Sequence, residues 1–119
     1  MPEVNYIIPC MLPGFNEMLG EALKNRRAYG RMKKEYTGLC MMASPNIKMK
    51  RVEHISIVWY VPNKRKDKDN IIASQKFIFD GLEKNGTIKR DSFNNIGTIF
   101  LDVKLDRNKP RIEVSIKYD

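Results

Sequence analysis

The chain has 119 residues and a formal net charge of +8, and 42% of its residues are hydrophobic. This length predicts a single domain spanning residues 1–119, and the apolar fraction excludes wholesale disorder. The excess of cations favours a polyanionic partner, nucleic acid first and an acidic membrane surface second. No stretch approaches the roughly 18 consecutive apolar residues of a membrane span.

Cysteine and histidine are scarce in this chain. Cys10 and Cys40 are too few for a disulfide framework, which predicts reduced, intracellular thiols. His54 is the only histidine, so a zinc site or a Ser-His-Asp triad would have to rest on that one residue. The first six residues have no basic start followed by an apolar core, so we expect no secretory signal.

The first half of the chain predicts a strand followed by helical structure. Residues 4–8 form a short apolar run that ends at a proline, as expected of a strand. From Phe15 to about Met42, apolar residues recur at spacings of three and four, which indicates a helix. The polar cluster 25–27 and Gly30 are the points at which this helix would divide in two.

The second half predicts a strand, a helix and two further strands. Residues 51–61 alternate as a strand, and the spacing of apolar residues predicts a helix over 70–84 with Gly86 as its left-handed stop. Residues 99–105 and 112–118 alternate as two more strands, which we expect to form a hairpin. In the strand predicted over residues 51–61, one face is apolar and consists of Ile55, Ile57, Trp59 and Val61.

The predicted order of elements is therefore β-α(α)-β-α-β-β. We expect an α/β (α+β) fold, in which a small mixed β-sheet of about four strands carries two to three packed helices.

A charged block before the predicted helix carries the strongest chemical signal. In the run Lys64–Asn70, Asp67 and Asp69 stand one residue apart among four cations. Carboxylates are hard oxygen ligands of the kind that Mg²⁺ prefers, and cations attract a phosphate backbone. The block therefore suggests a divalent metal held against a nucleic-acid phosphate.

The predicted helix extends this pattern. At about 100° per residue, Lys76 and Asp80 would share a face with Asp69, away from the apolar stripe. A metal held by carboxylates can position water and relieve charge during phosphodiester hydrolysis. A lysine beside it can stabilise developing negative charge or help to activate the water. Asp91, in the loop that follows, is a further candidate acid.

Simpler interpretations of the same residues stay open. Asp67 or Asp69 could cap the helix, and Lys76 with Asp80 could be a solvated surface pair. The cations between Lys24 and Lys34 could be an ordinary wet helix face.

Four short motifs occur in a restrictive order. They are Arg65–Asn70 with its Asp-x-Asp-Asn, Lys76–Leu82 ending in Asp-Gly-Leu, Asn85–Gly86, and Arg90–Ser92. In order and spacing they resemble the RusA family of Holliday junction resolvases. Leu12–Asn16 and Met32–Tyr36 are similar to the family's N-terminal segment and first helix, so the resemblance spans most of the chain.

The resemblance implies a homodimer that resolves four-way junction DNA by paired symmetric nicks during recombination and repair. It implies Mg²⁺ as the cofactor, with Mn²⁺ as a substitute, and neither a membrane partner nor a small-molecule substrate. It also implies a phage or prophage protein in the cytoplasm of a bacterial host. The implied catalytic residues are Asp67, Asp69, Lys76 and Asp91, the three aspartates being metal ligands, with Asn70 and Asp80 as accessory positions.

Ten cations are candidate contacts to the DNA phosphates, which they would bind by shape more than by sequence. They are Lys64, Arg65, Lys66, Lys68, Arg90, Arg26, Arg27, Arg31, Lys33 and Lys34.

Two positions depart from the family pattern. The family often places its lysine one turn after the second aspartate, where this chain has Ala73, so that Lys76 lies about 4.5 Å further along a continuous helix. Arg90-Asp91 replaces a common Asp-Asp pair. The alternatives are a catalytically inactive or repurposed DNA-binding protein of the same fold, a basic RNA- or protein-binding adaptor, and a nuclease acting on flaps or forks.

Overall fold

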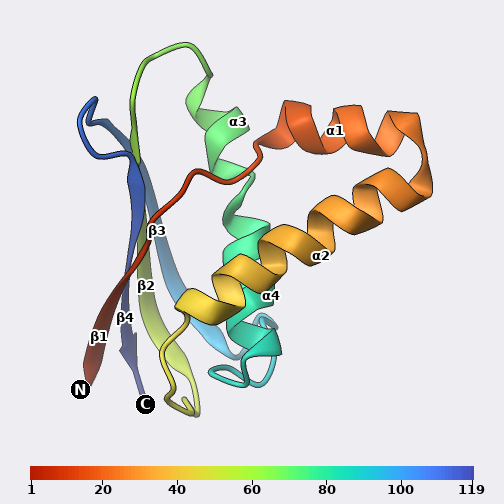
Figure 1. Cartoon of the computed structure of the whole chain (residues 1–119). Coiled ribbons are helices and arrows are strands. Elements are labelled where there is room, and N and C mark those ends of the chain that lie inside the picture. Colours follow the sequence, from red (N-terminus) through yellow and green to blue (C-terminus); the bar gives the residue numbers. More distant parts are fainter.

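A computed structural model describes residues 1–119 and shows a four-stranded mixed sheet with helices on one face (Figure 1). The strands are β1 (Glu3–Ile8), β2 (Val52–Val61), β3 (Ile96–Leu105) and β4 (Arg111–Tyr118). The helices are α1 (Phe15–Lys24), α2 (Arg26–Ala43), α3 (Lys68–Ile72) and α4 (Gln75–Lys84). The expected mixed sheet with packed helices is confirmed.

The core lies between the sheet and the helices α2 and α4. The apolar face predicted for β2 is confirmed, since Ile55, Ile57 and Trp59 are at most 1% exposed. From α4, Phe77 and Ile78 complete this layer. Burial of such side chains contributes roughly 1.5–3 kcal/mol each, so this layer is a major source of stability.

The long N-terminal helical segment divides at Asn25, as the polar cluster there suggested. Asn25 adopts an extended backbone, and its side chain accepts a hydrogen bond from the Ala28 amide at 2.8 Å, which caps α2. None of the residues of α1 is buried. In Figure 1, α1 and the N-terminal half of α2 (orange) project from the domain as a helical arm, defined here as Phe15–Lys34.

The helix predicted over 70–84 is two helices, which corrects the sequence interpretation. The chain bends at Ala73 and Ser74, where Phe77 N–H donates to the Ser74 carbonyl three residues back. Ser74 is 1% exposed; its hydroxyl donates to the Ile71 carbonyl at 2.8 Å and accepts from the Trp59 indole at 2.9 Å. This buried contact holds the bend against the sheet. At the far end, Gly86 has a φ of 79°, so the predicted left-handed stop is confirmed.

The predicted hairpin is wrong, because β2 lies between β3 and β4 in the strand order β1-β4-β2-β3. β2 pairs parallel with β3 and antiparallel with β4. β2 is the most apolar strand. As an inner strand, like β4, it is paired with a neighbour along both edges. The connection steps over the end of β2, where the Asp106 amide donates to the Val61 carbonyl at 2.8 Å.

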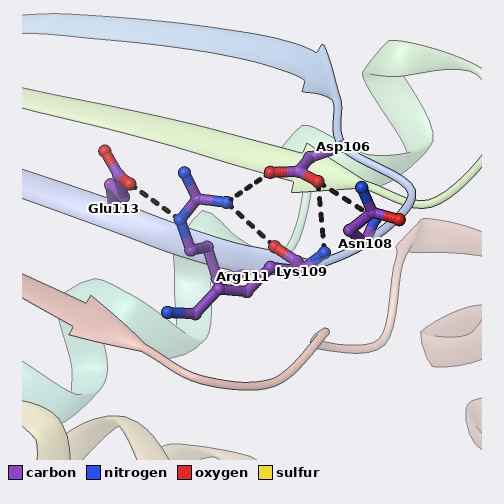
Figure 2. A network of polar contacts seen from close by, with 5 residues as sticks. All are labelled: Asp106, Asn108, Lys109, Arg111 and Glu113. Atoms are coloured by element: carbon purple, nitrogen blue, oxygen red, sulfur yellow. Dashed lines mark hydrogen bonds and ion pairs between the residues drawn. The ribbon is translucent and has the colours of Figure 1, made fainter.

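A network around Arg111 holds this connection (Figure 2). Its guanidinium donates to Asp106 Oδ2 at 2.8 Å, to the Lys109 carbonyl at 2.9 Å and to Glu113 Oε2 at 2.8 Å. The guanidinium also lies 4.0 Å from the centre of the Tyr60 ring on β2. The hydrogen bonds from Arg111 hold the pKa of Asp106 below its usual range.

Candidate functional site

The bend between α3 and α4 decides where the predicted site residues lie. Asp69 is on α3 and Lys76 is on the first turn of α4, so the two residues do not lie on one continuous helix. The bend at Ala73 and Ser74 falls between these two positions. The single helical face expected for Asp69, Lys76 and Asp80 is therefore not formed.

Asp67 and Asp69 border a shallow hollow at the start of α3. Phe15, Asn16, Asn70 and Ala73 form the rest of its lining. Both aspartates are exposed. Asp67 occupies the N-cap position without a side-chain capping bond, and Asp69 accepts from the Asn70 amide at 3.0 Å. Their carboxylates are thus largely free for a ligand.

Asn70 joins α3 to the start of α1. It is 9% exposed, and its side-chain oxygen accepts from the Asn16 amide at 2.7 Å. A Cβ on Gly14 would lie 2.7 Å from the Asn70 carbonyl, so only glycine allows this approach. Two of the motifs in the sequence resemblance are therefore neighbours in space, and Asn70 has a positioning role between them.

The other predicted acids form a separate group. Asp80, Glu83 and Asp91 have carboxylate oxygens within 4.8 Å of one another, a group that does not include Asp67 or Asp69. The structure thus brings Asp91 to α4 rather than to the acid pair. Glu83 was missed by the sequence reasoning, although its i+3 spacing from Asp80 is a signal that could have found it.

Lys76 completes this second group. Its Nζ lies 3.2 Å from Asp80 Oδ1, whereas Asp80 Oδ2 is buried without a hydrogen-bond partner. The hydrogen bond with Asp80 raises the pKa of Lys76. Lys76 therefore stays a cation at neutral pH, which suits stabilisation of negative charge and not proton abstraction.

A hollow of about 970 Å³ lies beside this group, between α4, β3 and the loop that connects them. Lys76 and Asp91 contribute charge to it, and Phe79, Phe93 and Ile99 contribute apolar surface. Arg51, also in its lining and missed by the sequence reasoning, donates from Nε to the Asn94 carbonyl at 3.0 Å. Ala73 lines this hollow and the Asp67–Asp69 hollow alike.

The predicted DNA-binding cations are all exposed. Five of them lie on the arm, on α2: Arg26, Arg27, Arg31, Lys33 and Lys34. The block Lys64–Lys68 leads into α3, which begins at Lys68, and Lys66 forms an ion pair with Glu17 of α1. Arg90 adjoins Asp91 on the loop after α4. Cations thus lie on the arm and next to both acid groups.

No helix in the structure combines the length and the apolar character needed to cross a membrane. Comparison with models of protein families gives no match, and comparison with curated proteins gives none either.

Proposed function

We propose that this protein is a divalent-metal-dependent, structure-selective endodeoxyribonuclease of the RusA type that resolves four-way DNA junctions. The observation that carries the proposal is the placement of two acid groups next to two hollows that share Ala73, with Lys76 bordering the second group. Carboxylates, a permanent cation and surrounding lysines and arginines are the groups that phosphodiester hydrolysis requires.

The donor atoms of both groups fit Mg²⁺, because all of them are hard carboxylate oxygens. Asp80 Oδ2, which is buried without a hydrogen-bond partner, is a ligand atom that a cation would satisfy. Asp67 and Asp69 would hold a metal in the first group, and Asp80, Glu83 and Asp91 would hold one in the second. When bound, Mg²⁺ supplies Lewis-acid stabilisation and a water of lowered pKa.

The residues of this chain would supply the remaining functions. Lys76 carries a positive charge next to the place where the phosphate would lie and opposes the negative charge of the transition state. Asn70 holds α3 against the start of α1, which would orient Asp69. Arg90 and the block Lys64–Lys68 would bind the phosphates on either side of the cut.

One alternative function is favoured by a specific observation. Asp91 lies in the Asp80–Glu83 group and not with Asp67 and Asp69, so a single three-aspartate metal site is not assembled in this chain. A protein of this fold that binds branched DNA without cutting it would need only the cations.

The decisive experiment is cleavage of a synthetic four-way junction in Mg²⁺, beside a linear duplex and a flap. We expect paired symmetric nicks on the junction, abolished by Asp69→Asn while junction binding persists. Glu35→Gln, which removes an exposed acid on α2, is the matched control and should retain full activity. Junction binding without any cutting would overturn the nuclease and favour the binding protein.

Substitutions in the second acid group test its part in the reaction. Under the proposal, Asp91→Asn and Asp80→Asn lower cleavage as strongly as Asp69→Asn, and Lys76→Met lowers it about 10²–10³-fold with partial rescue in Lys76→Arg. Calorimetric titration with Mg²⁺ separates the loss of metal from the loss of catalysis. Full activity of Asp80→Asn and Asp91→Asn would restrict the site to Asp67 and Asp69.

A further inference from the structure

β3 is an edge strand of the sheet. It pairs with β2 along its whole length, from Ile96 to Leu105, and has no strand on its other side. No strand pairs with the backbone groups along that side, although the Val103 amide already donates to Asp102 Oδ1 at 2.8 Å. Natural edge strands are usually short or carry prolines, charges or bulges that prevent such pairing. β3 has ten residues and no proline or bulge, and its two charged residues, Asp102 and Lys104, lie toward its C-terminal end.

Apolar side chains are exposed on both faces of this edge. Ile99 and Leu105, on the face that carries the helices, are 45% and 42% exposed. Phe100, on the other face, is 50% exposed, and Phe93 just before the strand is 95% exposed. The opposite edge, β1, is shorter: it has six residues, lies between Pro2 and Pro9, and exposes Glu3 and Asn5 as well as Ile7.

We infer that β3 pairs antiparallel with β3 of a second copy of this chain, about a two-fold axis at Phe100. A two-fold axis at one residue places that residue opposite itself and every neighbour opposite its mirror position. Centred on Phe100, the register aligns residues 96–104 of the two copies and so uses nearly the full strand.

The side chains of β3 are self-complementary in this register. Phe100 faces Phe100 of the second copy, and Ile99 faces Leu101, which joins apolar surfaces that are exposed in one copy. Thr98 faces Asp102, so that the hydroxyl can donate to the carboxylate. Axes at Asp102 or Lys104 would instead place like charges directly opposite each other, which is destabilising.

The same edge borders the candidate site. Ile96, Gly97 and Ile99 of β3 line the 970 Å³ hollow that also contains Lys76 and Asp91. The inference therefore deepens the proposed function, because it names the surface through which a two-fold nuclease would assemble. Its test needs neither DNA nor metal, so the two proposals can fail separately.

The experiment uses the self-pairing of Phe100. Sedimentation equilibrium of the wild-type chain is expected to show a dimer, and Phe100→Lys or Phe100→Glu alone is expected to be monomeric because like charges meet at the axis. An equal mixture of these two variants is expected to form a heterodimer, because a lysine then faces a glutamate. Leu23→Lys, at an apolar residue of α1 that is 77% exposed, is the matched control and should leave the dimer intact.

Three results would overturn the inference. They are a monomeric wild type at every concentration tested, a dimer unaffected by either Phe100 variant, and Phe100 variants that are monomeric apart and stay monomeric when mixed. Circular dichroism of each variant identifies loss of folding. A dimer that meets all expectations but cuts no junction would overturn the proposed nuclease and leave the inference standing.

Discussion

Cys40 shows how burial changes the chemistry of a single residue. It is 1% exposed on α2, where that helix crosses α4. Burial raises its pKa to about 12, with smaller contributions from Cys10 and Asp80. In an unfolded chain, a cysteine thiol has a pKa of about 8.5. The folded state therefore keeps the proton of Cys40 over a pH range in which the unfolded state loses it.

This difference predicts a pH dependence of stability. The contribution of Cys40 is complete below about pH 8.5 and is lost as the pH rises toward the folded pKa, because unfolding then releases a proton. Between pH 8 and pH 10 the free energy of unfolding should fall by about 1–2 kcal/mol through this group. Urea unfolding at several pH values measures it.

The control is the matched substitution at the other cysteine. Between pH 8 and pH 10, the free energy of unfolding of Cys40→Ala should fall less than that of Cys10→Ala. Cys40→Ala also leaves a small gap in the core, which lowers its stability at every pH without changing this slope. Equal slopes in the two variants would contradict the prediction.

Between elements, α2 and α4 cross at a point where only glycine fits. A Cβ on Gly81 would lie 2.6 Å from the Cys40 Cβ and 2.8 Å from the Met41 nitrogen, closer than real Cβ contacts. The Asp-Gly-Leu motif is thus explained in part by helix packing. Gly38, also on α2, has nothing within 4 Å of such a Cβ.

The two glycines predict opposite effects of the same substitution. Gly81→Ala should destabilise the fold by about 1–3 kcal/mol, because the helices must separate. Gly38→Ala should stabilise it by up to about 1 kcal/mol, because alanine is the better helix former. Thermal and urea unfolding of both variants measure the difference, and a neutral Gly81→Ala would show that the crossing can relax.

At the scale of the whole molecule, the arm carries six of the 22 lysines and arginines. Arg26, Arg27 and Arg31 are exposed on the part of α2 that projects from the sheet in Figure 1. Each phosphate that a cation neutralises releases condensed counterions from DNA. An arm that grips one branch of a junction would therefore make binding strongly dependent on salt.

Replacing these three arginines by glutamine tests the arm. We expect weaker junction binding and a plot of log affinity against log salt concentration that is shallower by about 1 for each phosphate that the protein no longer neutralises. Lys48, Lys50 and Lys117, exposed outside the arm, give a triple control of equal charge. Equal reductions in affinity in the two triple variants would mean that net charge alone, and not the arm, binds DNA.

Local sequence patterns were enough to predict the features that neighbouring residues control. Alternation along β2 predicted its buried face, the spacing of apolar residues located the helices, Asn25 marked the division between α1 and α2, and Gly86 marked the end of α4. These features depend on residues a few positions apart, whose preferences can be read directly. The metal, the junction substrate and the dimer stay predictions of the sequence resemblance.

The meeting of distant segments became visible only in the folded chain. Ser74 breaks the predicted helix because its hydroxyl meets Trp59, fifteen residues earlier. β2 separates β3 from β4 because the most apolar strand is buried at the centre of the sheet. Asp91 joins Asp80 and Glu83, and not Asp67 and Asp69, because the loop after α4 returns to that helix. Contacts between residues far apart in the chain depend on the packing of the complete fold, which no local pattern encodes.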